Sequence, residues 1–341
     1  MLLRAFAVLC LVVGTATMGC PAAAADFDRA KVIADLAALL HTDYFDPTVG
    51  DAAAGMLASQ APSLEKETDR AKFAAAVTAL LFSATHDKHL RLLDKPELLP
   101  ELAASPEAAA EMERARDYGI MSVSILPGNI GCLALSGFAR FTPDVAQHIG
   151  WAFDLLDGTY GLIIDLTASR GGDPVTEAEL VGYLTGPDVT LDAAILRDGS
   201  SRSVVTPKTY AGPAYGKTRP VALAVSARTF SAAEALPYDL QALGRAQVFG
   251  EQTRGGGNPG RFVPLSDGFI AFMPIAHTVN PLTHTSWEGK GVTPDHAVDA
   301  QRAVETARLS LVKQLLQTET DPTRRAILEA GLAPPPATQK P

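Results

Sequence analysis

Residues 221–241 read Val-Ala-Leu-Ala-Val-Ser-Ala-Arg-Thr-Phe-Ser-Ala-Ala-Glu-Ala-Leu-Pro-Tyr-Asp-Leu-Gln. The run 221–225 is apolar, rich in valine and short enough to be a strand that is buried on both faces. A helical pattern begins at Ser231 after a brief polar turn. A hydroxyl at such a junction suits a nucleophile, because free N–H groups and the positive end of the helix dipole lie where an oxyanion would form. Ser231-Ala-Ala-Glu234 is also a capping box, which explains the serine without any chemistry. The stretch therefore predicts a strand–turn–helix unit and leaves both interpretations of Ser231 open.

Strands and helices alternate on both sides of this unit. Prolines at 207, 213 and 220 indicate a linker region just before it. The alternation predicts an α/β domain that extends from about 117 to 318. Its other predicted strands are 121–126, 130–135, 161–166, 247–250, 261–265 and 269–275, and its other predicted helices are 144–156, 174–184 and one containing Val304, Ala307, Leu311, Val312 and Leu315.

The region before this domain is predicted to be helical. Apolar residues fall on one face at helical spacing in two segments, and Asp46-Pro47 starts a helix between them that Pro62-Ser63 breaks. About 60 residues are too few for an independent domain, so the unit should pack on the next one. We expect a helical subdomain at 26–87, an α/β core at 88–318 and a C-terminal tail at 319–341.

The first 25 residues are typical of a secretory signal peptide. Arg4 supplies the charged start, residues 5–13 the apolar run and Ala23-Ala24-Ala25 a small-residue cleavage site. The apolar run is too short for a membrane-spanning helix. We expect an exported, secreted or periplasmic protein whose mature chain starts near Asp26. A cut before Cys20 would instead leave a lipid-bearing cysteine, but residues 17–19 match that signal poorly.

Composition excludes some partners. The 341 residues carry a net charge of −9 and contain no basic run, so nucleic acid and anionic membrane surfaces are not expected partners, and no membrane insertion is expected after signal removal. Two of the three cysteines lie in the signal peptide, which leaves Cys132 without an internal disulfide partner. Cys132 lies in an apolar run and is predicted to be buried. The oligomeric state stays open.

A second strand end resembles the one before Ser231. The strand at 161–166 leads through Thr167-Ala-Ser-Arg170 to Gly171 and Gly172, and then to a helix. Such strand ends can lie side by side, and glycines let backbone N–H groups approach a ligand. An oxyanion hole could combine the N–H of Ala232 with that of Gly171 or Gly172, although a tight turn is the commoner use of two glycines. The glycine-rich loop 255–260 lacks the Lys-Ser/Thr ending of a phosphate-binding loop.

A serine nucleophile needs a base within hydrogen-bond reach. His277 and His284, which flank Pro281, remain open as bases. His86 and His89 are three residues apart, but no further ligand cluster nearby supports a metal site. Glu288 lies in a turn rich in glycine and proline, where a solvated carboxylate is the simpler interpretation. The other histidines have ordinary predicted positions: His41, His148 and His296.

Taken in order, these motifs resemble the tail-specific, C-terminal-processing serine peptidase superfamily over about 160–298. The resemblance implies a crotonase-like ββα core, a nucleophile at Ser231, and oxyanion donors at Ala232 and at a glycine of the 171–172 pair. The matching motifs are Asp165-Leu166 with Gly171-Gly172, Ser231-Ala-Ala-Glu234, Gly244-Arg-Ala246, Gly250-Glu-Gln-Thr253 with Gly255, and Gly291-Val-Thr-Pro-Asp295.

Within that superfamily, the start of the chain looks like the branch of interphotoreceptor retinoid-binding protein and the tricorn core. The match is Asp87-Lys-His89-Leu90. Gly256 stands where Ser–Lys members carry their lysine, so the resemblance implies His89 as the base and Glu288 as the group that orients or assists it. Lys88 replaces the serine that precedes the histidine in the tricorn core, and 167–170 lacks the usual Arg and Asn. No PDZ module is expected, because only about 25 residues separate Leu93 from Tyr118.

The sequence thus predicts an exported serine peptidase that acts on peptide or protein substrates and needs no cofactor or metal. Ser231, His89 and Glu288 are the expected catalytic residues, and Glu234 is expected to support the start of the helix. Two alternatives stay open. One is a non-catalytic carrier of apolar ligands on the same fold, and the other is a hydrolase of small esters or amides.

Overall fold

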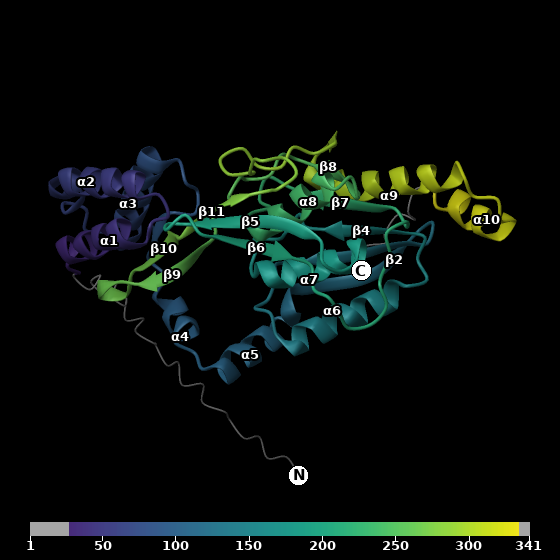
Figure 1. Ribbon diagram of the computed structural model, residues 1–341, viewed down its shortest axis with the longest axis horizontal. Helices are drawn as coiled ribbons and strands as arrows, with labels where there is room; N and C mark the ends of the chain where they lie inside the picture. Colours follow the sequence, from purple (N-terminus) through teal and green to yellow (C-terminus); the bar gives the residue numbers. More distant parts are fainter. Residues whose placement is uncertain (1–26, 334–341) are drawn as a thin grey trace, which may run out of the picture.

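The computed structural model describes residues 27–333 (Figure 1). The predicted signal peptide, the cleavage site near Asp26 and Cys20 lie outside the described residues, and so does the end of the predicted tail from Pro334. No described helix combines the length and the apolar character that crossing a bilayer requires. The prediction of an α/β fold with a helical N-terminal region is confirmed.

A six-stranded sheet forms the centre of the molecule, in the order β12-β8-β7-β4-β3-β2. β2 and β3 form an antiparallel hairpin, and the other neighbours are parallel. All five residues of β7 are buried, as expected for a strand covered on both faces. The bounds are β2 Ile120–Leu126, β3 Ile130–Leu135, β4 Gly161–Asp165, β7 Val221–Val225, β8 Ala246–Gly250 and β12 His296–Ala297.

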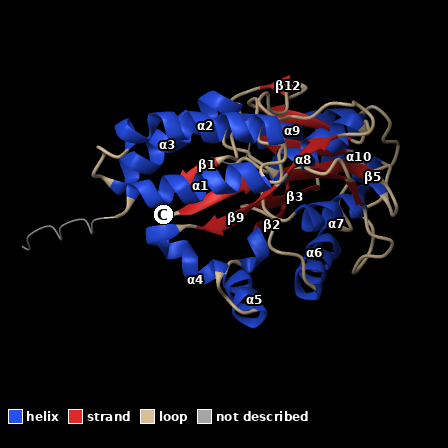
Figure 2. Cartoon of the chain, turned by 60° about the vertical axis from the view of Figure 1, so that its left-hand side comes forward, coloured by secondary structure: helices blue, strands red, loops and turns tan. Residues whose placement is uncertain are grey.

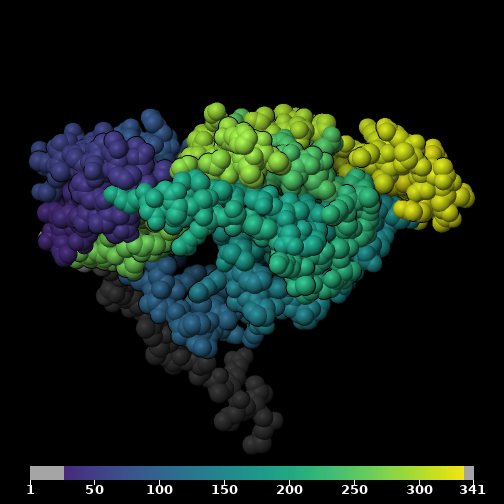
Figure 3. Space-filling view, in the orientation of Figure 1, coloured from purple at the N-terminus to yellow at the C-terminus, as the bar shows by residue number. Residues whose placement is uncertain are grey.

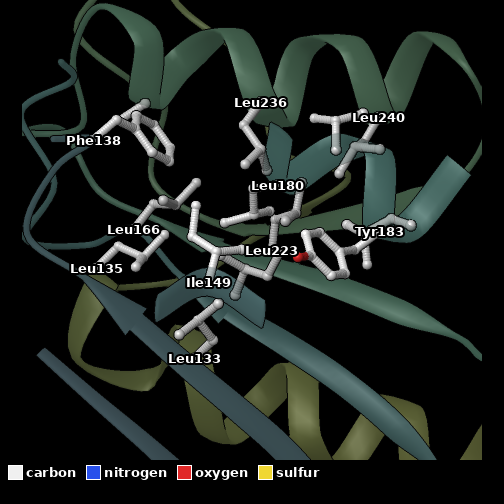
Figure 4. Close-up of a cluster of buried hydrophobic side chains, with 14 of the residues drawn as sticks. Leu133, Leu135, Phe138, Ile149, Leu166, Leu180, Tyr183, Leu223, Leu236 and Leu240 are labelled. Atoms are coloured by element: carbon white, nitrogen blue, oxygen red, sulfur yellow. The ribbon is translucent and has the colours of Figure 1, made fainter. Parts of the chain in front are cut away.

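Helices pack on both faces of this sheet. On one face Leu180 of α7 and Leu236 of α8 pack over Leu133 and Leu223 from the strands (Figure 4). On the other face the strand residues Cys132 and Ile163 pack with α9 and α10. The prediction that Cys132 is buried is confirmed. These helices are α6 Pro143–Leu156, α7 Pro174–Thr185, α8 Ala232–Ala242, α9 Ala300–Leu316 and α10 Pro322–Ala330.

The N-terminal helices form a lobe at one end of the molecule, coloured purple in Figure 3. They pack on a separate three-stranded sheet of order β1-β10-β9 (Figure 2). Leu92 from β1 and the late residues Phe269, Ala271 and Met273 belong to their core. The helical unit is therefore completed by later strands and does not close at residue 87. The bounds are α1 Arg29–Asp43, α2 Pro47–Leu64, α3 Arg70–Thr85, β1 Arg91–Leu93, β9 Gly260–Pro264 and β10 Ile270–Pro274.

A third sheet has the order β11-β5-β6, and two of its strands, β5 and β6, were not among the predicted strands. β5 and β6 form an antiparallel hairpin, and β11 pairs with β5. The bounds are β5 Thr190–Leu196, β6 Ser201–Val205 and β11 Ala276–Val279, and the short helices are η1 Pro96–Leu98, α4 Leu99–Leu102, α5 Pro106–Ala115, η2 Asp117–Gly119 and η3 Ser266–Gly268.

Two predicted boundaries are wrong. Pro62 does not break α2, which continues to Leu64; a proline so near the end of a helix forfeits little of the hydrogen-bond ladder. The tail predicted from residue 319 contains helix α10, because Leu328 is fully buried against the α9 side of the core.

Candidate active site

One cavity of about 520 Å³ brings together five of the residues that the sequence singled out. Its walls come from the N-terminal strand β1, the glycine turn after β4, the start of α8, the loop 256–260 and the sheet β11-β5-β6. Aromatic rings supply much of the lining. The predicted residues that line the cavity are His89, Gly171, Gly172, Ser231 and Ala232.

Ser231 holds an unusual backbone conformation directly before α8. Its φ of 59° and ψ of −134° lie in a region that residues with a side chain seldom adopt. Glu234 accepts the Ser231 N–H at 3.0 Å, which is one side of the predicted capping box. The Glu234 N–H lies 2.6 Å from the Ser231 carbonyl oxygen. Helix capping and a position on the cavity wall therefore occur at the same residue.

Three backbone N–H groups beside Ser231 are free. Within residues 27–333, the amides of Gly171, Gly172 and Ala232 donate to no protein acceptor. Gly171 has a φ of 95°, and a Cβ there would lie 2.7 Å from the Ser231 Cβ and 3.0 Å from the Ala232 nitrogen. Glycine is needed because any side chain would fill the space between these amides. The two strand ends meet as the sequence predicted.

His89 reaches the cavity from the turn before β1. Its ring lies between Phe230, at 4.4 Å, and Phe272, at 5.1 Å. The side chain is only 2% exposed, and Nδ1 is enclosed without a hydrogen-bond partner in the described part of the chain. Burial, as the largest cause, and the charges of Arg91 and Arg254 together lower the pKa of His89 to about 3. The imidazole is therefore neutral at ordinary pH.

Glu288 lies behind His89 in the loop after β11. One of its carboxylate oxygens, one of Asp87 and a ring nitrogen of His89 all lie within 4.8 Å of one another. Glu288 accepts the N–H groups of Gly257 and Asn258, the latter at 3.1 Å. Burial, as the larger cause, and the nearby Asp87 carboxylate together raise the pKa of Glu288 to about 7.

Lys88 contacts Glu288 through its backbone and not through its side chain. Its N–H lies 3.5 Å from Glu288 Oε1, at the limit of a hydrogen bond. Its ammonium group turns away and donates to the carbonyls of Arg254 at 2.5 Å and Gly289 at 3.1 Å. The lysine thus ties two loops together beside the site.

Asp87 is a buried carboxylate whose role the sequence did not reveal. Its oxygens accept the N–H groups of His89 at 2.8 Å and Leu90 at 3.3 Å, together with the side chains of Asn258 at 2.9 Å and Tyr44 at 3.3 Å. Asp87 therefore fixes the turn that carries His89. The available signal was an aspartate two residues before His89, since the side chain in an Asx turn accepts the N–H two residues on. Asp87, His89 and Glu288 could together ligate a metal ion, but the bonds just named already engage the Asp87 oxygens.

Glu234 connects Ser231 to the glycine-rich loop. Its fully buried carboxylate accepts the Thr253 hydroxyl at 2.5 Å and the N–H groups of Gly255 and Gly256 at 2.5 and 2.8 Å, in addition to Ser231. It thus supports the start of α8, as expected, and also holds the loop that lies over His89, since a Cβ at Gly256 would lie 2.8 Å from the His89 ring.

Replacing Glu234 with glutamine should therefore disturb both structure and activity. The amide NH₂ would face N–H donors, so we expect a loss of about 2–4 kcal/mol in the free energy of unfolding and a fall in activity. Denaturant unfolding measures the first. The exposed Glu97→Gln variant is the matched control, and equal stability of the two variants would contradict the role given to Glu234.

The remaining histidines lie elsewhere. Neither of the open candidates lines the cavity: the His277 ring on β11 contacts the Phe45 ring, and exposed His284 lies in a left-handed turn conformation. His86 ends α3 in the same conformation. Among the histidines of the described chain, only His89 lines the cavity. Other rings or acids contact the remaining three: His41 with Asp51, His148 with Tyr118 and Trp151, and His296 with Phe249.

Comparison with known proteins identifies the class. The model of Peptidase family S41 matches residues 129–298. The chain belongs to this family and is a serine-type peptidase.

Solved structures of low sequence identity share the fold. A lipoprotein from Streptococcus agalactiae is 14% identical, with a TM-score of 0.56 over 84% of this chain and 96% of the lipoprotein. A protein from Parabacteroides merdae, described as a candidate peptidase, is 15% identical, with a TM-score of 0.52 over 80% and 90%. Mature CPAF is 12% identical, with a TM-score of 0.51 over 89% and 98%.

Proposed function

We propose that the protein is an exported peptidase in which Ser231 is the nucleophile, His89 the general base and Glu288 the group that orients His89. The observation that carries this proposal is the shared cavity, which His89, Ser231 and the free amides of Gly171, Gly172 and Ala232 all line.

The reaction follows from these positions. His89 takes the proton of the Ser231 hydroxyl while the oxygen attacks the peptide carbonyl. The amide N–H groups of Ala232 and of Gly171 or Gly172 stabilise the oxyanion. The imidazolium then gives its proton to the leaving amine, and a water molecule activated by His89 releases the acyl group from Ser231.

The charges around His89 fit this task. A neutral imidazole can accept a proton, whereas an imidazolium cannot. The charged form that arises during the reaction lies beside the carboxyl groups of Glu288 and Asp87, within 4.8 Å. An ionised Glu288 would stabilise it, in the role that the third member of a catalytic triad has.

This arrangement predicts a pH dependence. Because the pKa of Glu288 is raised to about 7, the carboxylate forms only as pH rises through that value, and kcat/KM should rise with it. Protonation of His89, whose pKa is about 3, should not limit the rate in that range. Glu288→Gln should lower kcat/KM by ~10-fold or more and flatten the rise. A pH profile of both proteins checks this, and an unchanged profile in the variant would exclude Glu288.

An active-site fluorophosphonate probe tests the nucleophile directly. The wild type should be labelled, and the label should map to Ser231 by peptide mass spectrometry. Equal labelling of wild type and Ser231→Ala would remove Ser231 from the mechanism. A panel of peptides and small esters then separates a peptidase from a hydrolase of small substrates, because both share the serine chemistry.

Export rests on the leader sequence. The charged start, apolar run and alanine cleavage site of residues 1–25 support secretion or a periplasmic location. Sequencing the N-terminus of the protein from the cell envelope should give a start near Asp26. A start at Cys20 would support the lipid-anchored alternative.

A further inference from the structure

Three buried carboxyl groups lie together beside the cavity. Glu177 of α7, Asp192 of β5 and Asp239 of α8 are 1%, 6% and 0% exposed. Each has one enclosed oxygen, Glu177 Oε1, Asp192 Oδ1 and Asp239 Oδ2, to which no other residue type of the described chain donates a hydrogen bond. The carboxyl groups of Asp192 and Asp239 share a hydrogen bond with each other, which requires a proton on one of them. Such a concentration of buried carboxyl groups is costly.

No cation of the described residues compensates this cluster. None of the three acids forms an ion pair there; the Asn280 amide donates to Asp239 Oδ1 at 2.8 Å, and Asp192 and Asp239 hydrogen-bond each other. Burial and mutual repulsion raise the pKa of Glu177 and Asp239 well above their usual range, and burial raises that of Asp192 to about 7. These carboxyl groups therefore hold protons that a bound cation could replace.

Asp192 connects this cluster to the cavity. It is the one acidic residue among the described residues that line the cavity with Ser231. In the sheet, Asp192 pairs with Val204, and Ala194 pairs with Thr278. All four line the cavity, so one face of the sheet presents small and apolar side chains with a carboxyl group beside them. That surface suits a side chain with an apolar stem and a charged end.

We propose that Asp192 is a specificity-determining residue that binds a cationic side chain, lysine or arginine, of the peptide substrate. The inference rests on the proposed function, because the subsite belongs to the cavity of Ser231. An ammonium or guanidinium group would donate to the Asp192 carboxylate, in place of the proton that Asp192 and Asp239 share, and would supply positive charge. Glu177 and Asp239 would contribute by making the electrostatic potential at Asp192 more negative.

Other residues of the cavity lining carry the other sign of charge. Arg91 from β1 and Arg170 from the turn after β4 also line it. Arg91 lies 5.8 Å from the Phe272 ring, on the His89 side. A substrate cation would thus be repelled from those residues and drawn to the β5 wall, which gives the proposed subsite a single location.

Binding tests the inference without requiring catalysis. We suggest peptide libraries in which one position is fixed as Lys, Arg, norleucine or Glu and the others are randomised, measured on immobilised Ser231→Ala protein. Norleucine has the lysine stem without the charge. Lys and Arg libraries should be retained ~10-fold or more over norleucine, and Asp192→Asn in the Ser231→Ala background should remove that difference. Asp198→Asn, in the exposed turn between β5 and β6, is the matched control and should keep it.

The outcomes separate the two proposals. Retention of norleucine equal to lysine, or a lysine preference that survives Asp192→Asn, would overturn the role of Asp192. If the fluorophosphonate probe fails to label Ser231 while the lysine preference is present and depends on Asp192, the catalytic proposal fails and the subsite stands. Should Asp192→Asn not fold, Asp192→Glu tests the same subsite: its longer side chain should shift the preference from arginine toward the shorter lysine, and an unchanged ratio would count against the inference.

Discussion

Ser231→Ala is expected to lower peptide hydrolysis by ~10⁴-fold or more. Without the hydroxyl no acyl-enzyme can form, and only binding and the free amides of the cavity remain to favour attack by water. Alanine can take the same backbone conformation with the same strain, so the fold should persist. Cleavage of a complex peptide mixture, followed by mass spectrometry of the new N-termini, measures the loss.

The control for this variant is Ser203→Ala. Ser203 is exposed on β6, in the hairpin that forms part of the cavity wall, and should keep full activity. Both variants should unfold at the wild-type temperature. Retention of more than about a tenth of the wild-type rate by Ser231→Ala would be incompatible with a Ser231 acyl-enzyme.

His89→Gln has the second largest expected effect, a loss of ~10²–10⁴-fold in kcat. Glutamine keeps a polar side chain between Phe230 and Phe272 but cannot take the serine proton. A purely structural role would lower stability and leave kcat of the folded fraction unchanged. Added imidazole should restore part of the rate if the cavity admits it.

The comparison variant is His148→Gln. His148 lies in α6, and its ring contacts Tyr118 and Trp151. It is distant in sequence from Phe230, which contacts His89. It should retain wild-type kcat. Equal kcat values for the two variants would contradict the assignment of His89 as the base. Labelling of His89→Gln by the fluorophosphonate probe at the wild-type rate would also contradict it.

The sequence predicted most of the elements whose signals are local. The apolar run of β7 and the hydroxyl before α8 are adjacent in the chain, and the alternation of strands and helices fixes the layers of the core. The two glycines and Ser231 were predicted to meet because parallel strand ends share an edge. The buried position of Cys132 was predicted from the apolar residues next to it in the chain.

Elements that depend on distant contacts were missed. The β5–β6 hairpin, Thr-Leu-Asp-Ala-Ala-Ile-Leu and Ser-Arg-Ser-Val-Val, lacks a regular alternation of polar and apolar residues and pairs with β11, some 80 residues later. Leu328 is the one buried residue of helix α10, and its contact with α9 holds the helix. The role of Asp87 depends on hydrogen bonds from Asn258 and Tyr44, which are distant from it in the sequence. The pairing of β1 with β10 likewise could not be read from either segment alone.

That last pairing has a consequence for the newly made protein. The strand next to His89 finds its partner only after residues 270–274 have left the ribosome, and Glu288 follows later still. A growing or prematurely terminated polypeptide thus contains His89 before the neighbouring strand β1 has its partner strand. With His89 as the base, proteolytic activity should therefore appear only late in biosynthesis.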